Sequence, residues 1–429
     1  MRTGLRIAVI GSGISGLSAA WLLSRQHRVS LLESGEYLGG HSHTVDVSLG
    51  GISAPVDTGF LVFNDRTYPN LNALFREIGV AWTASDMSFS VRLEESGLEW
   101  AGSSLATVFA QKRNLVSPEF WRMLKDIMRF NREATALARA AGPVRGTLGE
   151  FLERGGYGRA FADWYLLPMG GAIWSCPTGE MLEFPAETFL RFCFNHGLLA
   201  VNGRPKWRTV NGGAREYVRR LTADVADVRT GVRVERVLRG ETGAEILLHG
   251  GRTERYDRLV LACHADQSLR LLADADAEER AVLGAFRFQK NRALLHTDAS
   301  FLPRNRDAWS AWNYHAGPRG DSGAPLSVSY LINRLQPLPF TQPVLVTLNP
   351  YREPAPGTIV GDYEYDHPLF DAAAVAAQGR LASVQGRRCT WFCGAWTGYG
   401  FHEDGLKSGL AVANHMGVRA PWQESEAAA

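Results

Sequence analysis

A glycine-rich turn between two apolar runs dominates the start of the chain. Residues 7–10 are apolar, the motif G-x-G-x-x-G follows at Gly11, Gly13 and Gly16, and a second apolar run over 29–32 ends at Glu33. The residues between the two runs carry apolar side chains at helical spacing. Strand, turn, helix, strand and acid in this order within about 30 residues indicate a dinucleotide-binding βαβ unit.

Each part of this unit has a physical task. Gly11 permits the tight turn, Gly13 lets the backbone approach a pyrophosphate, and Gly16 lets the helix pack closely on the strand. The helix N-terminus attracts phosphate, and an acid after the second strand accepts hydrogen bonds from a ribose. We therefore expect a dinucleotide to be bound by Gly11, Gly13, Ile14, Ser15, Gly16, Glu33 and Ser34.

Length and charge narrow the class of protein. A chain of 429 residues is long enough for two domains. Its 46 basic residues are scattered among 44 acidic ones, for a net charge of +2, so we expect no nucleic-acid partner. The apolar content of 45% is that of a soluble globular enzyme.

The cysteines predict a reducing compartment and no metal. Five cysteines occur without a C-x-x-C pair, and no His or Cys completes zinc spacing around Cys389 and Cys393. The glycine motif explains the apolar stretch 7–24 better than a signal peptide does, and we expect no transmembrane helix. A cytoplasmic location follows as an expectation.

A second glycine pair adds a family resemblance. Gly39 and Gly40 follow the ribose acid, and the segment Asp57-Thr58-Gly59-Phe60 comes after a probable strand pair. This pattern resembles the flavin-containing amine oxidase and phytoene desaturase superfamily, in which Arg usually follows the glycine pair, whereas His41 stands here. The resemblance implies FAD, with further contacts from Gly39, Gly40, His41, Thr58, Gly59, Phe60 and the backbone near Val234.

The segment 391–413 resembles the third FAD motif of the same superfamily, a strand, a glycine-rich loop and a last helix. The family usually has Asp or Glu after the glycine that ends the strand, and this acid contacts the ribityl chain of FAD. Ala395 follows Gly394 here. The resemblance therefore implies that the ribityl contact is either lost or supplied by Glu403 or Asp404. A helix N-terminus here stabilises negative charge on a reduced flavin. The implied contacts are Gly394, Ala395, Glu403, Asp404, Gly405 and Leu406.

The predicted fold is α/β: a Rossmann-like FAD-binding domain of the glutathione-reductase type with an inserted α+β substrate domain. We expect residues 1–63, 205–280 and 380–418 in the FAD domain, 64–204 and 281–379 in the substrate domain, and 419–429 as a disordered tail. Residues 64–203 read as aromatic-rich helical segments, with 170–177 as an irregular pocket wall, and 288–330 as strands of a second sheet.

The longest predicted helix spans residues 117–140. It has Ser117 as N-cap, Pro118 at its first position, and an apolar side formed by Phe120, Trp121, Leu124, Ile127 and Met128. Its basic polar face suits an anionic membrane surface, whereas a core-facing helix is the commoner cause of such a pattern. Peripheral contact with the inner membrane therefore stays open.

A narrower resemblance suggests a substrate. The GHSHT, DTGF, LHTD, WNYH and GAWTGYGFHEDGLKSG stretches are similar to bacterial flavoproteins associated with enzymes that methylate fatty-acyl chains of phospholipids. One relative of that group is assigned to the desaturation of a methylene-bearing acyl chain on the route to furan fatty acids. The resemblance implies a hydrophobic or acyl-lipid substrate and an unspecified electron acceptor.

The loop before the last helix holds the candidate catalytic residues Trp396, Tyr399 and His402. His402 is the best candidate proton acceptor because an imidazole ordinarily titrates near neutral pH. An amine oxidase that releases hydrogen peroxide would use Lys290 and an aromatic cage of Trp396 and Tyr399. Trp174, Trp312 and Tyr314 would instead line an apolar tunnel. A double-bond isomerase and a non-catalytic flavin or lipid carrier are further alternatives.

Overall fold

The glycine-rich unit forms as predicted. The computed structural model describes residues 3–140, 142–175, 177–200, 203–317 and 327–423. Strand β1 (Arg6–Ile10) leads through the glycine turn into helix α1 (Ile14–Leu23), and β2 (Arg28–Leu32) returns beside β1 in parallel. Residues 7–9 of β1 are completely buried, as expected for a parallel strand that is covered on both faces.

A five-stranded parallel sheet grows from this unit in the order β10-β2-β1-β14-β20. Its other strands come from distant parts of the chain: β10 (Asp227–Arg229), β14 (Arg258–Leu261) and β20 (Thr390–Phe392). Helices α1, α10 (Arg215–Thr222) and α15 (His402–His415) contribute buried side chains to the core on one face. The predicted α/β class is therefore confirmed.

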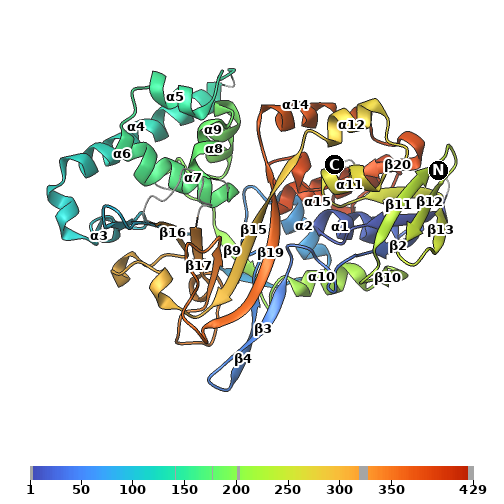
Figure 1. Cartoon of the computed structure of the whole chain (residues 1–429), viewed down its shortest axis with the longest axis horizontal. Coiled ribbons are helices and arrows are strands. Elements are labelled where there is room, and N and C mark those ends of the chain that lie inside the picture. The colour runs from blue at the N-terminus through green and yellow to red at the C-terminus, as the bar shows by residue number, and fades with distance from the viewer. Residues whose placement is uncertain (1–2, 141, 176, 201–202, 318–326, 424–429) are drawn as a thin grey trace.

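The other face of this sheet carries a smaller sheet and three helices. Strands β11 (Val234–Arg239), β12 (Ala244–Leu248) and β13 (Thr253–Tyr256) form an antiparallel sheet. The helices are α11 (Ala265–Leu271), α12 (Ala277–Leu283) and α14 (Ala372–Arg380). We call this whole half, on the right in Figure 1, the cofactor lobe.

The second lobe is built on a seven-stranded sheet in the order β19-β15-β18-β17-β16-β7-β8. Its strands are β19 (Ile359–Leu369), β15 (Arg287–His296), β18 (Leu345–Leu348), β17 (Ser327–Leu331), β16 (Trp312–Ala316), β7 (Phe89–Leu93) and β8 (Leu98–Ala101). The predicted second sheet over 288–330 is confirmed. Strands β7 and β8 correct the expectation of helices there, because the backbone of β7 pairs with β16 and that of β8 pairs with β7.

Helices cover one side of this sheet and form the outer end of the molecule (Figure 1). They are α3 (Leu105–Val108), α4 (Pro118–Ala140), α5 (Leu148–Arg154), α6 (Arg159–Phe161), α7 (Leu167–Trp174), α8 (Thr178–Leu182) and α9 (Ala186–Asn195). The irregular wall predicted for 170–177 is wrong over 170–174, which continue helix α7. Its apolar side chains supply buried packing that a glycine pair alone does not reveal, and Cys176 lies outside the described residues.

Helix α4 begins where the sequence predicts. The hydroxyl of Ser117 accepts a hydrogen bond from the Phe120 amide at 3.3 Å, and Pro118 is the first helical residue. The predicted apolar side is only partly buried. Phe120 is buried, but Trp121 is 50% and Met128 59% exposed, because the core side of the helix is centred on Met123 and Phe130 instead.

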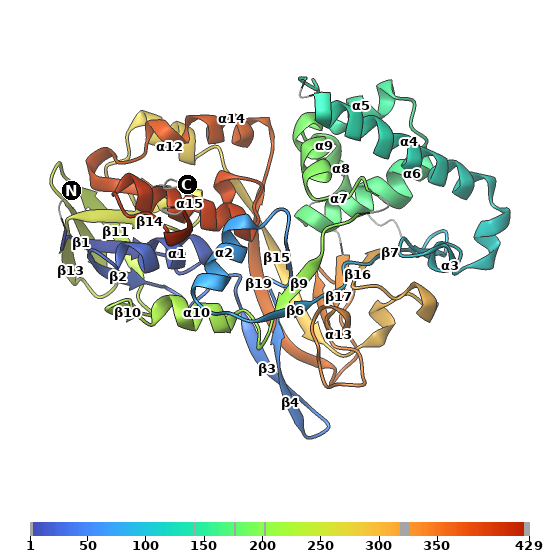
Figure 2. The same cartoon turned by 180° about the vertical axis from the view of Figure 1, so that it is seen from behind.

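Short strands and a hairpin lie where the two lobes meet. The hairpin of β3 (Thr44–Leu49) and β4 (Ile52–Asp57) projects from this junction, and α2 (Pro69–Glu77) packs on the cofactor lobe. Strand β9 (Trp207–Val210) pairs with β5 (Phe63–Asn64) and β6 (Trp82–Ala84). Figure 2 shows β6 and β9 between the lobes.

The end of the chain departs from the predicted disordered tail. Residues 419–423 are described, and the Trp422 ring stacks on Trp21 of α1 with ring centroids 6.2 Å apart. The Trp422 indole also donates to Asn70 at 3.1 Å. Residues 424–429 lie outside the described residues, and the predicted domain boundaries stay predictions. Within the described chain no helix is long and apolar enough to cross a membrane.

Candidate functional site

The glycine turn is shaped by close backbone contacts. Gly11 has a φ of +101°, and a Cβ there would lie 2.8 Å from the carbonyl oxygen of Ala262. A Cβ on Gly16 would lie 1.9 Å from the Gly11 oxygen. On Gly13, by contrast, a Cβ would meet nothing within 4 Å. Gly11 and Gly16 therefore close the turn, and Gly13 faces open space.

The carboxylate of Glu33 joins the glycine turn to the segment that follows β2. Its Oε2 accepts hydrogen bonds from the Ser12 amide at 2.9 Å and the Ser12 hydroxyl at 2.6 Å, and its Oε1 accepts from the Gly35 amide at 2.8 Å. The Ser34 hydroxyl approaches the same oxygen at 3.4 Å. These four hydrogen bonds equal the number of lone pairs on the carboxylate, so a ribose hydroxyl that binds Glu33 would replace one of them, and the long Ser34 contact is the weakest.

The second glycine pair lies over the first motif. Gly39 and Gly40 have φ angles of +117° and +57°, and a Cβ on Gly40 would lie 3.4 Å from the Cα of Gly13. The Gly39 amide donates to the Ser12 hydroxyl at 3.1 Å. Two segments that the sequence assigns to one cofactor are therefore adjacent in space.

The segment after β4 packs against the same loop. The Phe60 amide donates to the His41 carbonyl at 2.7 Å, and the Thr58 amide donates to the His43 carbonyl at 2.9 Å. A Cβ on Gly59 would lie 2.3 Å from the His41 oxygen. Thr58, Gly59 and Phe60 therefore lie beside His41, and the contact of all four with a flavin stays a prediction.

Helix α15 begins beside the start of α1. A Cβ on Gly405 would lie 2.7 Å from Ile14 Cγ2, and the Gly394 amide donates to the Ser408 hydroxyl at 2.9 Å. No side chain caps the first turn of α1, which holds Ser15. The N-termini of two helices thus converge, and both favour a negatively charged ligand.

Several of the expected cofactor residues have partners within the chain. Glu403 accepts three hydrogen bonds from the start of α2, at 2.8 to 3.0 Å from the Asn70 side chain and the amides of residues 70 and 71. Asp404 accepts from the amides of Tyr399 and Phe401. Burial raises the pKa of both carboxyls. Leu406 is completely buried in the core, so only its backbone is available to a ligand.

Val234 lies at the buried start of β11. The neighbouring Val232 amide donates to the carbonyl of Glu33 at 2.8 Å, which places this strand beside the end of β2. The adenine end of a dinucleotide whose ribose binds Glu33 would therefore pass near Val234.

Ala395 is the first residue of the short turn that follows Gly394.

The three candidate catalytic residues have different surroundings. Trp396 is 2% exposed, packs on Phe286 with ring centroids 4.6 Å apart, and donates from its indole to the Cys263 carbonyl at 3.2 Å. Tyr399 is partly buried, and its ring is 5.8 Å from that of Phe192. Trp396 is thus a core residue of the cofactor lobe, whereas Tyr399 contacts the helical part of the second lobe.

His402 is held in a buried hydrogen-bond chain. Its Nε2 lies 2.7 Å from the Tyr217 hydroxyl and 3.3 Å from the Ser42 hydroxyl, and Tyr217 in turn donates to Ser42. The imidazole stacks on Phe60 at 3.7 Å. Burial lowers the pKa of His402 to about 3. The neutral-pH titration that made His402 a proton acceptor in the sequence analysis is therefore absent.

Two further histidines that no sequence motif singled out, His264 and His367, lie near His41. The rings of His41 and His367 are 5.3 Å apart, and His264 Nδ1 lies 3.8 Å from a carboxylate oxygen of Asp366. Burial lowers the pKa of all three imidazoles, that of His367 to about 4. The available signals were a histidine directly after the β14 strand and the alternating aromatic run of β19.

Three buried polar atoms in this histidine group have no hydrogen-bond partner among the described residues. They are Nε2 of His41, Nδ1 of His264 and Oδ1 of Asp366. Buried polar groups ordinarily have partners, so these atoms fit a ligand that carries donors and acceptors. Together with the open space at Gly13 and the two helix N-termini, they fit a flavin dinucleotide. No cluster of metal-ligating side chains occurs within the described ranges.

Lys290 has a different environment from the one an amine oxidase requires. Its ammonium pairs with Glu364 at 2.6 Å, and the two side chains are 71% and 58% exposed. The residue therefore lies on the outer surface of the β15–β19 ladder. Neither Lys290 nor Trp396 occupies the expected amine site.

Comparison with known protein families gives one match. Residues 14–287 match the family model described as flavin containing amine oxidoreductase. A carotenoid phi-ring synthase of Streptomyces griseus is 29% identical over 321 residues, which are 69% of this chain and 58% of that protein. One from Chlorobaculum tepidum is 30% identical over 200 residues, 44% of this chain and 27% of that protein. The chain thus spans less than two thirds of either relative.

Solved structures share the whole fold. A fatty acid isomerase from P. acnes superposes with a TM-score of 0.68 at 16% identity, covering 97% of this chain and 99% of its own. Putrescine oxidase bound to putrescine gives 0.68 at 16% identity with 97% and 99% coverage, and reduced UDP-galactopyranose mutase 0.67 at 15% identity with 96% and 95%. Such identities show the fold alone, and the narrower likeness to methyltransferase-associated flavoproteins stays a prediction. The family match over more than half of the chain establishes that this protein belongs to the flavin containing amine oxidoreductase family.

Proposed function

We propose that this protein is an FAD-dependent oxidoreductase that desaturates a lipid fatty-acyl chain by removing hydride from it. The proposal includes methylated or methylene-bearing acyl phospholipids in furan fatty acid formation. Glu33 and Val234 favour FAD among flavins, because they lie where the adenosine half of a dinucleotide would be. The names of the fatty acid isomerase and the carotenoid phi-ring synthases are consistent with an apolar substrate.

The observation that carries the proposal is an aromatic wall beside the loop that precedes α15. Phe192 of α9 packs on Tyr399 at 5.8 Å, on Phe401 at 5.0 Å and on Trp174 at 4.5 Å between ring centroids. The wall continues into the apolar core of the helical part of the second lobe. An acyl chain offers no polar group, so its binding depends on apolar surfaces of this kind.

The placement of two residues argues against an amine substrate. Trp396 is packed in the core against Phe286, which leaves 2% of it exposed to an amine, and Lys290 is at the surface in an ion pair. The lipid hypothesis requires neither residue.

A bound flavin would supply the hydride acceptor. The residues of this chain bind the flavin, orient the substrate and shield the reacting carbon from water. Gly13 leaves room for the pyrophosphate beside the turn that Gly11 and Gly16 close, the N-terminus of α1 favours its negative charge, and that of α15 would favour negative charge on a reduced flavin. His402 is a neutral hydrogen-bonding group at physiological pH, because burial keeps its pKa at about 3. The aromatic wall excludes water from the reacting carbon.

The direct test is the absorption spectrum of the purified protein before and after anaerobic addition of a lipid extract from cells that lack it. Flavin bands that bleach with the extract would support a lipid dehydrogenase, and the extract can then be fractionated. Bands that persist while double bonds move in the lipid would favour a redox-neutral isomerase. Bands that persist without lipid change would favour a carrier.

Two variants distinguish a lipid substrate from an amine substrate. Phe192→Ala shortens the aromatic wall, and we expect bleaching by lipid to slow about tenfold or more. Lys290→Ala should leave it unchanged, because Lys290 is outside the site. Peroxide formation from an amine panel that is lost in Lys290→Ala would contradict the lipid proposal.

A further inference from the structure

Exposed apolar side chains are concentrated at the outer end of the second lobe. Five of them, at 49% to 82% exposure, come from residues 105–128: Leu105, Leu115, Val116, Trp121 and Met128. They belong to α3, to the 3₁₀ turn Lys112–Val116 and to α4. Soluble monomers rarely expose contiguous apolar patches, and those that do use them for binding.

The patch is continuous. The Trp121 indole donates to the Leu115 carbonyl at 2.9 Å, so the ring lies over the 3₁₀ turn. Its ring is also 5.2 Å from that of Phe109, which follows α3. Trp121 thereby connects α3, the turn and the start of α4 into one surface.

The exposed stripe of α4 alternates apolar and basic residues. Trp121, Lys125, Met128, Arg132 and Arg139 are all exposed, and their spacings of four, three, four and seven place them on one line along the helix. The buried residues Phe120, Met123 and Phe130 lie on the opposite side.

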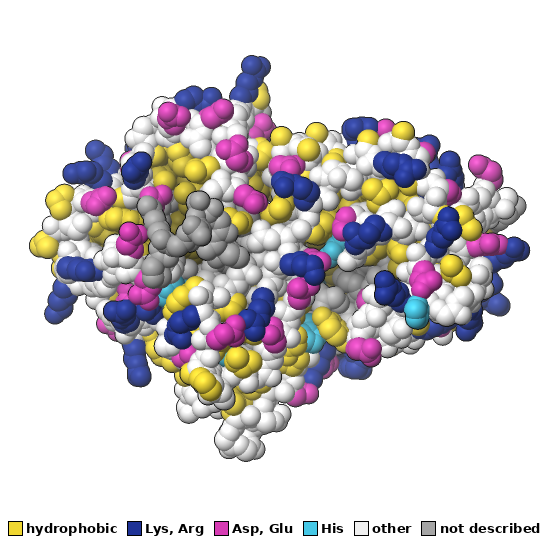
Figure 3. All heavy atoms as spheres, viewed as in Figure 1, with side chains coloured by type: hydrophobic (Ala, Val, Ile, Leu, Met, Phe, Trp, Pro, Cys, Tyr) yellow, Lys and Arg dark blue, Asp and Glu magenta, His cyan; other side chains and the backbone are white. Residues whose placement is uncertain are grey.

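Two of the three acidic residues of α4 are turned away from this stripe, and the third, Glu119, is exposed in the first turn but lies two residues before Trp121 and so off its line. Asp126 pairs with Arg129 at 3.1 Å, and Glu133 accepts from the Tyr157 hydroxyl at 2.5 Å, both toward the neighbouring segment 155–158. The stripe therefore presents positive charge without an intervening acid. Figure 3 shows hydrophobic and basic side chains side by side along the edge where α3 lies.

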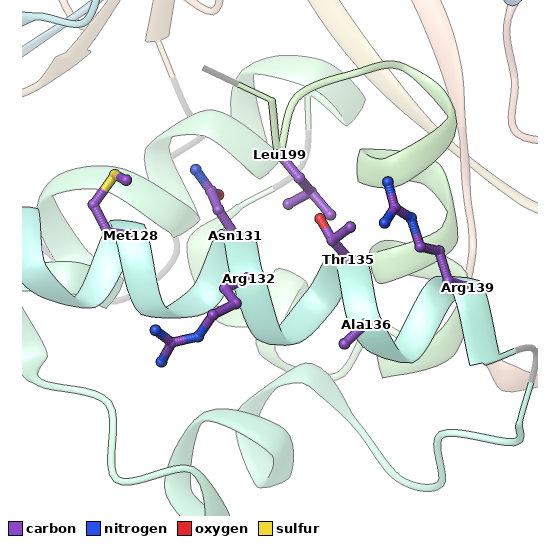
Figure 4. Close-up of a pocket in the computed structure, with 7 residues that line it drawn as sticks. All are labelled: Met128, Asn131, Arg132, Thr135, Ala136, Arg139 and Leu199. Carbon is purple, nitrogen blue, oxygen red and sulfur yellow. The ribbon is translucent and has the colours of Figure 1, made fainter. Parts of the chain in front are cut away.

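A hollow extends the stripe toward the C-terminal half of α4. It measures about 430 Å³, and Met128, Thr135, Arg139 and Leu199 are among the residues that line it (Figure 4). Its lining combines the apolar Met128, Ala136 and Leu199 with Arg132 and Arg139, and so repeats the chemistry of the patch.

We infer that the face formed by α3, the 3₁₀ turn and α4 docks on the surface of an anionic lipid bilayer. Leu105, Leu115, Val116 and Trp121 would enter the boundary between headgroups and acyl chains, where Trp is favoured. Lys125, Arg132 and Arg139 would contact lipid phosphates, each lysine or arginine adding attraction to a negatively charged surface. This inference is independent of the proposed substrate, because docking does not require turnover.

The test uses the full-length protein and vesicle co-sedimentation. We expect binding to vesicles of equal parts phosphatidylcholine and phosphatidylglycerol, weak binding to phosphatidylcholine alone, and release at high salt. The double variant Leu105→Asp/Val116→Asp should bind about tenfold more weakly or worse, as should Lys125→Glu/Arg132→Glu. All four side chains are exposed, so these variants should keep the wild-type melting temperature.

Leu238→Asp is the matched control. Leu238 is 49% exposed, but it lies on β11 in the cofactor lobe, far from the patch, and its substitution should leave vesicle binding unchanged. Wild-type protein that stays in the supernatant, or equal losses in the control and the patch variants, would overturn the inference. A wild-type dimer that becomes monomeric in Leu105→Asp/Val116→Asp would overturn it as well, since the face would then join two copies of the chain.

Discussion

Gly13 is the residue whose substitution best separates cofactor binding from folding. A Cβ at this position meets no atom within 4 Å, so Gly13→Val should fold with its stability unchanged. The added side chain would occupy the space into which a pyrophosphate must come. We expect the purified variant to lose its flavin absorption bands. Gly379→Val is the control, because a Cβ there also meets nothing within 4 Å but lies in α14; a fully yellow Gly13→Val protein would refute the site.

Substitution of His402 tests whether its buried imidazole has a catalytic or a structural role. His402→Ala removes the stack on Phe60 and leaves the Tyr217 hydroxyl with one partner fewer. We expect the free energy of unfolding in urea to fall by about 2–4 kcal/mol, because a buried group and its hydrogen bond are lost. The wild-type pH–rate profile should show no inflection from His402 near neutral pH, since burial keeps its pKa at about 3. Unchanged stability with abolished turnover would assign His402 a catalytic role.

Single residues also show what a sequence pattern leaves out. His402 and Trp396 stood out because of their position before the last helix, and both turned out to be buried and bonded within the chain. His264 and His367 went unnoticed because they are separated by about a hundred residues in the sequence and meet where His264 stacks on Phe288 of β15, the strand that pairs with β19. Convergence of this kind depends on strand pairing, which composition and spacing do not encode.

At the scale of elements, the contact between α1 and α15 depends on glycine. A Cβ on Gly409 would lie 2.2 Å from the Ser18 hydroxyl and 2.4 Å from the Ser15 carbonyl oxygen. Gly409→Val should therefore separate the two helices, lower the unfolding free energy by about 1–3 kcal/mol, and weaken flavin retention. Thermal unfolding and the flavin-to-protein absorbance ratio measure both effects. A variant with wild-type stability would show that the helices can move apart freely.

Helix α4 shows which features of a single element the sequence pattern predicts. Its N-cap, its first proline and its length follow from local sequence preferences, and all three were predicted. Which apolar residues are buried was predicted only in part, because Trp121 and Met128 lie outside the stripe that the neighbouring helices cover. Strand β7 was missed for a related reason, since its partner β16 is more than 200 residues away along the chain, and β8 joins the sheet through β7.

At the scale of the whole molecule, buried histidines predict an acid-sensitive fold. Burial lowers the pKa of His196 and His367 to about 4 and that of His402 to about 3. Below the ordinary pKa near 6.5, the unfolded chain binds protons that the folded protein does not. The free energy of unfolding should therefore fall as the pH drops from about 6.5 toward about 4, by about 1.4 kcal/mol per pH unit for each such histidine.

Urea denaturation midpoints across this pH range check the prediction. His402→Gln titrates one buried histidine fewer, so its stability should change less steeply with pH than that of the wild type. A midpoint that stays constant from neutral pH down to about 4 would contradict the neutral, buried state of these imidazoles.

The sequence by itself determined the glycine turn, its helix, the acid at the end of β2 and the last helix, and with them the flavin family. These features are local, because a tight turn and a helix N-terminus require particular residues at fixed spacing. Only the tertiary structure decided that Glu403 binds the start of α2, that Lys290 is at the surface, and that Trp422 packs on α1. It also decided which side of α4 is exposed. Burial and partners at these positions depend on segments brought together by two sheets, and a residue's own neighbours in the sequence carry no information about them.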